Sequence, residues 1–252
     1  MSFVDFARAH GVEINNLYPS ERIRRCGTTD KPKSTNGAYF YDGNRGWCMN
    51  WADEAKVIWY NDPNAKPWTD EEKRAWAAHR ESQRTEQQIK YEQTPALADF
   101  TLRNAKMESH PYLEIKGFGD LQGYVLDGKL LIPMRNVSTH KLQGYQEIFW
   151  DEPNRKYEKK MLVGMRAKNA VFWMGEKDSG ESWLVEGYAT GLSLHKALRS
   201  VGLDATVVVC FSAVNLVQVA DQIKGKRFIF ADNDKSQTGE KSAISKIGRA
   251  HV

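Results

Sequence analysis

Apolar and polar residues alternate in the first quarter of the chain, between Arg22 and Tyr60. The large apolar residues that recur near a period of two are Ile23, Tyr39, Tyr41, Trp47, Met49, Trp51, Val57 and Trp59. Glycines at 37, 43 and 46 separate these runs and mark turns. This pattern predicts a small antiparallel sheet with hairpins. We expect residues 1–20 to form an irregular arm or short helix, and residues 1–66 to form a small β-rich domain.

A helical connector is predicted over residues 67–109. Thr69 and Glu72 have the spacing of a capping box, in which each side chain bonds the other's backbone N–H. The polar stretch from there to about Glu92 predicts a long, exposed helix. A second helix is expected from Pro95 to about Ser109.

The remaining chain contains two regions with different patterns of predicted strands and helices. Strands are predicted at 129–135, 142–150 and 170–174, with a basic turn at 155–160, so residues 110–180 read as an α+β subdomain. In residues 181–252, strands at 183–185, 206–211 and 227–231 alternate with helices at 189–199 and 215–223. Apolar strands joined by helices predict a parallel βαβαβ sheet covered on both faces.

Three carboxylates follow the strands of this last region. Glu186 comes directly after the first strand, and Asp232 and Asp234 follow the third. Because the carboxyl ends of parallel strands meet at one edge, these side chains are expected to converge there. Oxygen ligands beside bound phosphates suit Mg²⁺. Gly187 would allow the turn into a helix, and Gly239 would allow a close backbone approach to a ligand.

Composition narrows the function classes. The net charge of +4 permits binding to a phosphate backbone without requiring it. The three cysteines are widely spaced, which argues against a disulfide framework and against zinc and favours a cytoplasmic location. No apolar run has the length of a membrane span, so no membrane partner is expected.

Basic residues cluster in two regions. Lys129 and Arg135 flank one predicted strand, and Lys156, Lys159 and Lys160 lie in the predicted turn, so this subdomain is a candidate surface for nucleotide or template. In the N-terminal region, arginines and lysines at 22, 24, 25, 31 and 33 are interleaved with aromatic residues. That second pattern fits either a surface for single-stranded nucleic acid or a solvated edge over an aromatic core.

The segment Val185-Glu186-Gly187-Tyr188-Ala189-Thr190-Gly191-Leu192-Ser193, followed by Ala231-Asp232-Asn233-Asp234, resembles the Toprim domain. Bacterial-type DNA primases, type IA and II topoisomerases and some nucleases share this domain. The chain is most similar to the primase-like proteins of phages, plasmids and mobile elements. The segments at 110–113, 131–135, Gln146 and 156–157 look like the subdomain that precedes Toprim in primases, and residues 30–37 look like the leader region of the phage and plasmid proteins.

This resemblance implies a DNA primase-like nucleotidyltransferase that makes short primers on single-stranded DNA during phage or plasmid replication. Glu186 would act in acid/base or metal chemistry, and Asp232 and Asp234 would bind one or two Mg²⁺ ions, for which Mn²⁺ can substitute. Arg135 and Lys156 match basic positions that contact template or nucleotide. The implied partners are a single-stranded template, nucleoside triphosphates and a replicative helicase.

The chain departs from the primase pattern in two ways. The cysteines of the N-terminal zinc ribbon of bacterial primases are missing, and the Toprim sheet is expected to be truncated. Residues 246–252 can be back-translated to a common sequencing adapter, so we expect them to be a read-through artefact. Two alternatives stay open: another Toprim activity that cleaves DNA strands, and a non-catalytic module that binds single-stranded DNA.

Overall fold

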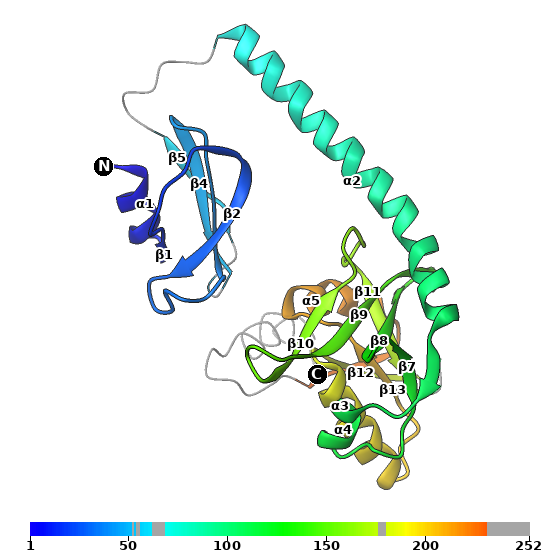
Figure 1. Cartoon of the computed structure of the whole chain (residues 1–252). Helices are drawn as coiled ribbons and strands as arrows, with labels where there is room; N and C mark the ends of the chain where they lie inside the picture. The colour runs from blue at the N-terminus through cyan, green and yellow to red at the C-terminus, as the bar shows by residue number, and fades with distance from the viewer. Residues whose placement is uncertain (52, 54–55, 62–68, 176–179, 231–252) are drawn as a thin grey trace. The chain divides into compact units, whose positions relative to one another are not determined.

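The computed structural model of the chain describes residues 1–51, 53, 56–61, 69–175 and 180–230 (Figure 1). The chain divides into two compact units, Met1–Ala77 and Ala78–Val252. The first contains an antiparallel sheet, and the second contains a mixed sheet with helices. The expectation of a mixed α and β fold is therefore confirmed.

The first unit is built on a meander of five strands among its described residues, in the order β1-β2-β3-β4-β5. The strands are β1 (Val12–Glu13), β2 (Ser20–Thr28), β3 (Gly37–Tyr41), β4 (Arg45–Asn50) and β5 (Ile58–Asn61). Helix α1 (Phe3–Ala9) covers one face, where Phe3 and Ala7 pack with Tyr39, Cys48 and Tyr60. The aromatic side chains supply the apolar area that so small a sheet needs for a core.

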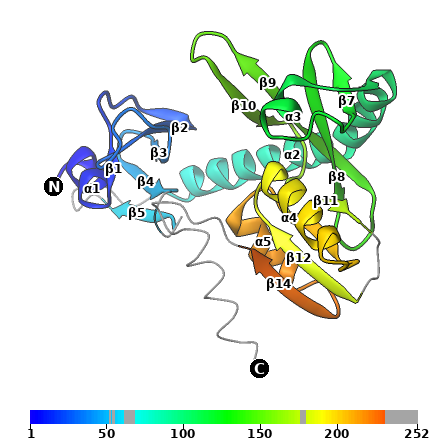
Figure 2. The same ribbon diagram turned by 90° about the horizontal axis from the view of Figure 1, so that it is seen from below.

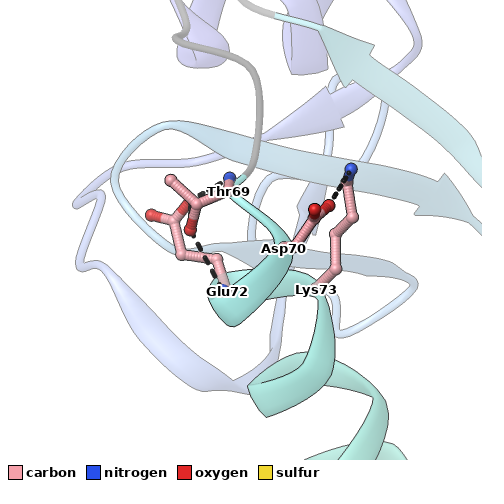
Figure 3. Close-up of polar contacts among 4 residues, drawn as sticks. All are labelled: Thr69, Asp70, Glu72 and Lys73. Atoms are coloured by element: carbon pink, nitrogen blue, oxygen red, sulfur yellow. Dashed lines mark hydrogen bonds and ion pairs between the residues drawn. The ribbon is translucent and has the colours of Figure 1, made fainter.

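Helix α2 (Asp70–Asn104) begins at the predicted capping box (Figure 3). The Glu72 carboxylate accepts from the N–H of Thr69 at 2.8 Å, and the Thr69 hydroxyl accepts from the N–H of Glu72 at 3.2 Å. The prediction of a second helix that starts at Pro95 is wrong, because α2 continues through this proline. An interior proline costs about 3 kcal/mol, and burial of Ala98 and Leu102 beyond it helps to offset that cost.

The second unit continues with short elements and long strands. It contains β6 (Lys106–Glu108), α3 (Pro111–Ile115), β7 (Gly123–Leu126), β8 (Lys129–Asn136), β9 (Leu142–Asp151), β10 (Lys156–Met161) and β11 (Ala170–Met174). Then come β12 (Glu181–Val185), α4 (Tyr188–Ser200), β13 (Thr206–Val209), α5 (Ala213–Ala220) and β14 (Lys226–Phe230). The predicted basic turn at 155–160 is wrong, since most of it is strand β10, paired antiparallel with β9.

One mixed sheet of nine strands unites the described strands of this unit (Figure 2). Its main path runs β10-β9-β8-β11-β13-β12-β14, and β7 and β6 pair beside β8. Strand β12 is parallel to both β13 and β14, whereas β11 joins β13 and β8 antiparallel. The parallel βαβαβ arrangement predicted for the last region is therefore present as one part of a larger mixed sheet.

Two helices cover opposite faces of the parallel strands. Leu192 and Leu198 of α4 pack in one buried cluster with Val185, Val207 and Val209. On the other face, α5 contributes to a second cluster, whose buried members are Val137, Val171, Leu184, Val208, Cys210, Leu216, Val219 and Ala220. Because consecutive strand residues point to opposite faces, the unbroken apolar runs of β12 and β13 serve both clusters.

Across the described part of the chain, no helix combines the length and apolarity that crossing a membrane demands.

Candidate functional site

The carboxyl ends of β12 and β13 form a topological switch point. The chain leaves β12 toward α4 on one face, and it leaves the neighbouring strand β13 toward α5 on the other face. Loops that diverge in this way open a crevice at the strand ends, which is where open α/β sheets bind their ligands. This edge is therefore the first place to look for a site.

Glu186 lies at this edge, one residue beyond β12, and its side chain is partly exposed. Gly187 follows as the N-cap of α4, with extended backbone and no side chain to crowd the edge. The carboxylate of Glu186 lies close enough to Cys210 to act on its thiol: burial raises the pKa of Cys210, and the charge of Glu186 raises it further. The glutamate therefore sits where the sequence predicted, beside the end of β13.

The backbone next to Glu186 is held from the side of β13. The N–H of Cys210 donates to the carbonyl of Val185 at 2.8 Å, and the N–H of Phe211 donates to the carbonyl of Glu186 at 2.9 Å. Phe211 has a positive φ of 65°, a left-handed conformation that is uncommon for a bulky residue. This turn ends the strand and starts α5, whose N-cap is Ser212.

Gly191 sets how closely α4 approaches the sheet. A Cβ at this position would lie 2.7 Å from a methyl group of Val209 and 3.3 Å from one of Val185. A side chain at this position would fit only if the helix or the Val209 side chain moved. Gly191 belongs to the segment that resembles Toprim, but the sequence alone did not indicate this packing role.

Asn215 is a polar residue that sequence reasoning missed. It is buried in α5, and its side-chain oxygen accepts from the N–H of Asn169 at 2.7 Å. Its amide donates to the carbonyls of Ala170 at 2.8 Å and Cys210 at 2.9 Å. One side chain thus ties the start of β11 to the end of β13. The Ser212 cap three residues earlier is the only local signal that could have pointed to it among the residues described.

Arg135 shares a face of the sheet with Glu186. In one row of the sheet Phe172 of β11 is opposite Val209 of β13, which is opposite Val185 of β12. Val171 of β11 is opposite Arg135 of β8. Continuing the register one residue past the ends of β13 and β12 aligns Cys210 and Glu186 with this pair. Opposed residues point to the same face, here the α5 face that contains Cys210. Three inter-strand steps of about 4.8 Å put the two backbones ~14 Å apart.

The predicted lysines do not join Arg135 in one cluster. Lys129 starts β8, six residues before Arg135 or ~20 Å along the strand. Its ammonium pairs with Glu147 at 3.0 Å, and the ammoniums of Lys129 and Lys160 lie 5.3 and 5.1 Å from the ring centre of Phe149. Lys129 and Lys160 therefore form a separate site at the β8–β10 end of the sheet.

Lys156 and Lys159 also lie apart from each other. Lys156 pairs with Glu158 at 2.8 Å, and this contact raises the pKa of the lysine. Lys159 is opposite Ile148, which belongs to the buried cluster on the α4 face. Its ammonium lies 5.7 Å from the ring centre of Tyr112. Lys159 thus faces the opposite side of the sheet from the row of Glu186 and Arg135.

Aromatic rings line the α4 side near Lys159. The rings of Tyr112 and Trp150 each meet Tyr157 edge to face, with centroids 5.2 Å apart. Tyr188 packs on Phe172 at 5.6 Å, and burial, with a contribution from Tyr112, raises the pKa of Tyr188 to about 12. The Tyr188 phenol therefore stays protonated at neutral pH and carries no charge.

Asp232, Asp234 and Gly239 lie outside the described residues. The strand that precedes the two aspartates, β14, ends at Phe230, which is opposite Val185. Among the described residues there is no group of three His, Cys, Asp or Glu side chains that could hold a metal ion. Since two of the three predicted ligands lie beyond that range, the metal site stays a prediction.

No protein-family model matches this chain, and a search of curated proteins finds no match either.

Proposed function

We propose that this protein is a Toprim-type, primase-like nucleotidyltransferase, which joins nucleotides into short primers on a single-stranded DNA template. The observation that carries the proposal is the position of Glu186 one residue past the carboxyl end of the central parallel strand, at the same edge of the sheet as Arg135. An acid and a guanidinium at the carboxyl edge of a sheet, beside a topological switch point, suit a phosphate substrate that is bound with a divalent cation.

The pairing of β12 with β14 relates Glu186 to the two predicted aspartate ligands, Asp232 and Asp234. Val185, the residue before Glu186, is paired with Phe230, and Asp232 follows Phe230 by two residues in the sequence. A donor set of one glutamate and two aspartates has the hard oxygen chemistry that Mg²⁺ prefers. When bound, the ion would neutralise negative charge on the triphosphate and on the pyrophosphate leaving group. Mn²⁺ is the expected substitute.

The residues of this chain then have separate tasks. Glu186 would hold a metal ion or a proton near the reacting phosphate, and the residue is partly exposed. Arg135 is exposed and would bind a phosphate oxygen; its guanidinium lies 3.4 Å from the carbonyl of His140, which orients it. Asn215 and Phe211 would position the edge without touching the substrate.

Primer synthesis from ribonucleoside triphosphates on a single-stranded template tests the proposal. Glu186→Gln and Asp232→Asn should each lower kcat by about 100-fold or more, because each removes a charge needed at the reacting phosphate. Arg135→Gln should raise KM for nucleotide or template roughly tenfold, the effect of losing one charge-assisted hydrogen bond.

Glu181 provides a matched control for Glu186. It is a carboxylate at the amino end of the same strand, where it pairs with Lys226 at 2.9 Å. Glu181→Gln should leave primer synthesis unchanged. If the wild type binds template without extending it, the binding module is the better explanation. Cutting of supercoiled DNA that depends on Glu186 would instead indicate the strand-cleaving Toprim alternative.

A further inference from the structure

Tryptophans gather on the face of the N-terminal sheet that α1 leaves uncovered. Trp47 of β4 is directly opposite Trp59 of β5 and Phe40 of β3. Since the neighbours Tyr39 and Cys48 point into the core beneath α1, these three rings point to the other face. We call Arg25, Trp47, Trp51 and Trp59 the tryptophan face.

Two of these rings are open to solvent. Trp59 is 59% exposed and Trp51 is 46% exposed, whereas Phe40 and Met49 in the middle of the face are buried. Trp59 of β5 is directly opposite Trp47 of β4, and Trp51 lies one residue past the carboxyl end of β4. The face therefore offers one exposed ring beside Trp47 and another just beyond the end of the same strand.

A positive charge accompanies the rings. Arg25 of β2 shares a row with Ala38 and Met49, and its guanidinium lies 5.3 Å from the ring centre of Trp51. The described residues of β3 and β4 that point to this face are 38, 40, 45, 47 and 49, and none of these is acidic. Helix α2 meets the face at Phe40, whose ring centre lies 5.5 Å from that of Trp76, and the Glu72 carboxylate lies near Arg45, away from Arg25 and Trp51 in the register of the sheet. A cation beside exposed indoles fits an anion that also carries flat aromatic groups.

We propose that the tryptophan face binds single-stranded nucleic acid, with bases stacked on Trp51 and Trp59 and a phosphate paired with Arg25. Any base can stack on an indole, so this surface would hold a strand with little regard to its sequence. This binding surface is separate from the catalytic chemistry proposed for the second unit. It depends on neither Glu186 nor a metal ion.

Binding of a short fluorescein-labelled oligothymidine to the full chain, followed by anisotropy in EDTA without nucleotides, tests this surface. Trp51→Ala and Trp59→Ala should each weaken binding about fivefold or more, the loss expected for one base stacked on an aromatic ring. Trp59→Phe should retain most of the affinity, because phenylalanine still offers a ring. Tyr18→Ala removes an exposed aromatic residue outside the strands and should change nothing.

Two adjacent arginines form a charge-matched pair of variants. Arg25 is on the tryptophan face, whereas Arg24 is opposite Tyr39 on the α1 face, and both are exposed. Arg25→Gln should weaken binding and reduce the slope of log affinity against log salt by about 0.7, the value for one phosphate contact on a single strand. Arg24→Gln should leave the slope close to that of the wild type.

The two proposals fail in different ways. Equal weakening by the Arg24 and Arg25 variants would indicate diffuse electrostatic attraction and overturn the tryptophan face as a site. Unchanged affinity in Trp51→Ala and Trp59→Ala, with unchanged circular dichroism, would do the same. So would a result in which these substitutions alter only the self-association of the protein, measured by sedimentation, and leave DNA binding intact. Asp232→Asn should bind the oligonucleotide like the wild type, so loss of primer synthesis alone leaves this inference intact.

Discussion

Replacing Asn215 should weaken the second unit strongly, and with aspartate at this position the loss of stability should depend on pH. Its buried amide satisfies the N–H of Asn169 and the carbonyls of Ala170 and Cys210. Asn215→Leu keeps a similar volume but leaves these three backbone groups without their side-chain partner. Each buried polar group left unsatisfied costs about 1–3 kcal/mol. We expect a loss on the order of 4 kcal/mol, which is a large share of the stability of a typical domain.

Asn215→Asp keeps the shape and changes only the chemistry. A carboxylate at this position would still accept from Asn169, but it would face the carbonyls of Ala170 and Cys210 with no proton to donate. Burial and these carbonyls favour the neutral acid, so the folded-state pKa of the new carboxyl should be raised above its unfolded value of about 4. The folded state then binds more protons than the unfolded state.

The sign of the pH dependence follows from this difference. Stability contributed by the protonated acid is present below pH ~4 and is lost as the pH rises toward the raised folded-state pKa. Relative to the wild type, Asn215→Asp should lose up to about 1.4 kcal/mol per pH unit over that window. Urea unfolding at pH 5 and pH 7, followed by tryptophan fluorescence, measures this difference directly.

The control is Asn104→Asp, because the Asn104 side chain is exposed and donates to Phe100 within α2. It should unfold with the same pH dependence as the wild type. If Asn215→Asp also follows the wild-type curve between pH 5 and pH 7, Asn215 does not hold β11 and β13 together as described, and the reasoning is refuted.

Three further predictions concern other parts of the chain. Gly191→Ala should destabilise the second unit by about 1–2 kcal/mol in urea unfolding, because the added methyl group would press on Val209 by more than the gain in helix propensity offsets. Thr69→Ala should speed amide exchange at Glu72 roughly fivefold, because the N-terminal cap of α2 is lost. Burial raises the pKa of Cys26 to about 11, so iodoacetamide at pH 8 should alkylate this thiol roughly 200-fold more slowly in the folded protein than in urea.

Each of these has a control and a contrary outcome. Ser193→Ala changes an exposed residue of α4 and should leave stability nearly unchanged. If it destabilises the protein as much as Gly191→Ala does, close packing at Gly191 is not the cause of the loss. Thr101→Ala lies within the same long helix and should not affect exchange at Glu72. Alkylation of Cys26 should accelerate about tenfold per pH unit up to its raised pKa, and a plateau near pH 9 would show that the thiol is not buried.

Apolar runs in the sequence were sufficient to find most strands of the second unit. Strand β11 has the predicted bounds, and β8, β9, β12, β13 and β14 lie within a few residues of theirs. All of these strands except β14 have several buried residues, and a side chain that meets the core must be apolar. Glu186 was found for a related reason: a charged residue that interrupts a buried run marks the end of the strand.

The local sequence pattern led to wrong predictions for one strand rich in charged residues and for one helix that contains a proline. Strand β10 is partly exposed and rich in lysine, so it reads as a turn, yet pairing with β9 stabilises it. Helix α2 passes through Pro95 because residues beyond it are buried against the sheet. In both cases the decisive energy comes from partners that are distant in the sequence.

Strand order decided which side chains meet, and the linear chain does not contain that information. The sequence predicted three carboxylates after strands of the last region and a set of basic residues in the preceding subdomain. From the sequence alone, any of these basic residues could have been on the same face of the sheet as Glu186. The pairing of β8 with β11, β11 with β13 and β13 with β12, continued one residue past the strand ends, aligns Arg135 with Glu186 and leaves Lys159 on the opposite face. Hydrophobic periodicity depends on residues that are close in the sequence, so it can be read from the sequence. The register between strands depends on the packing of the whole sheet, so only the tertiary structure reveals it.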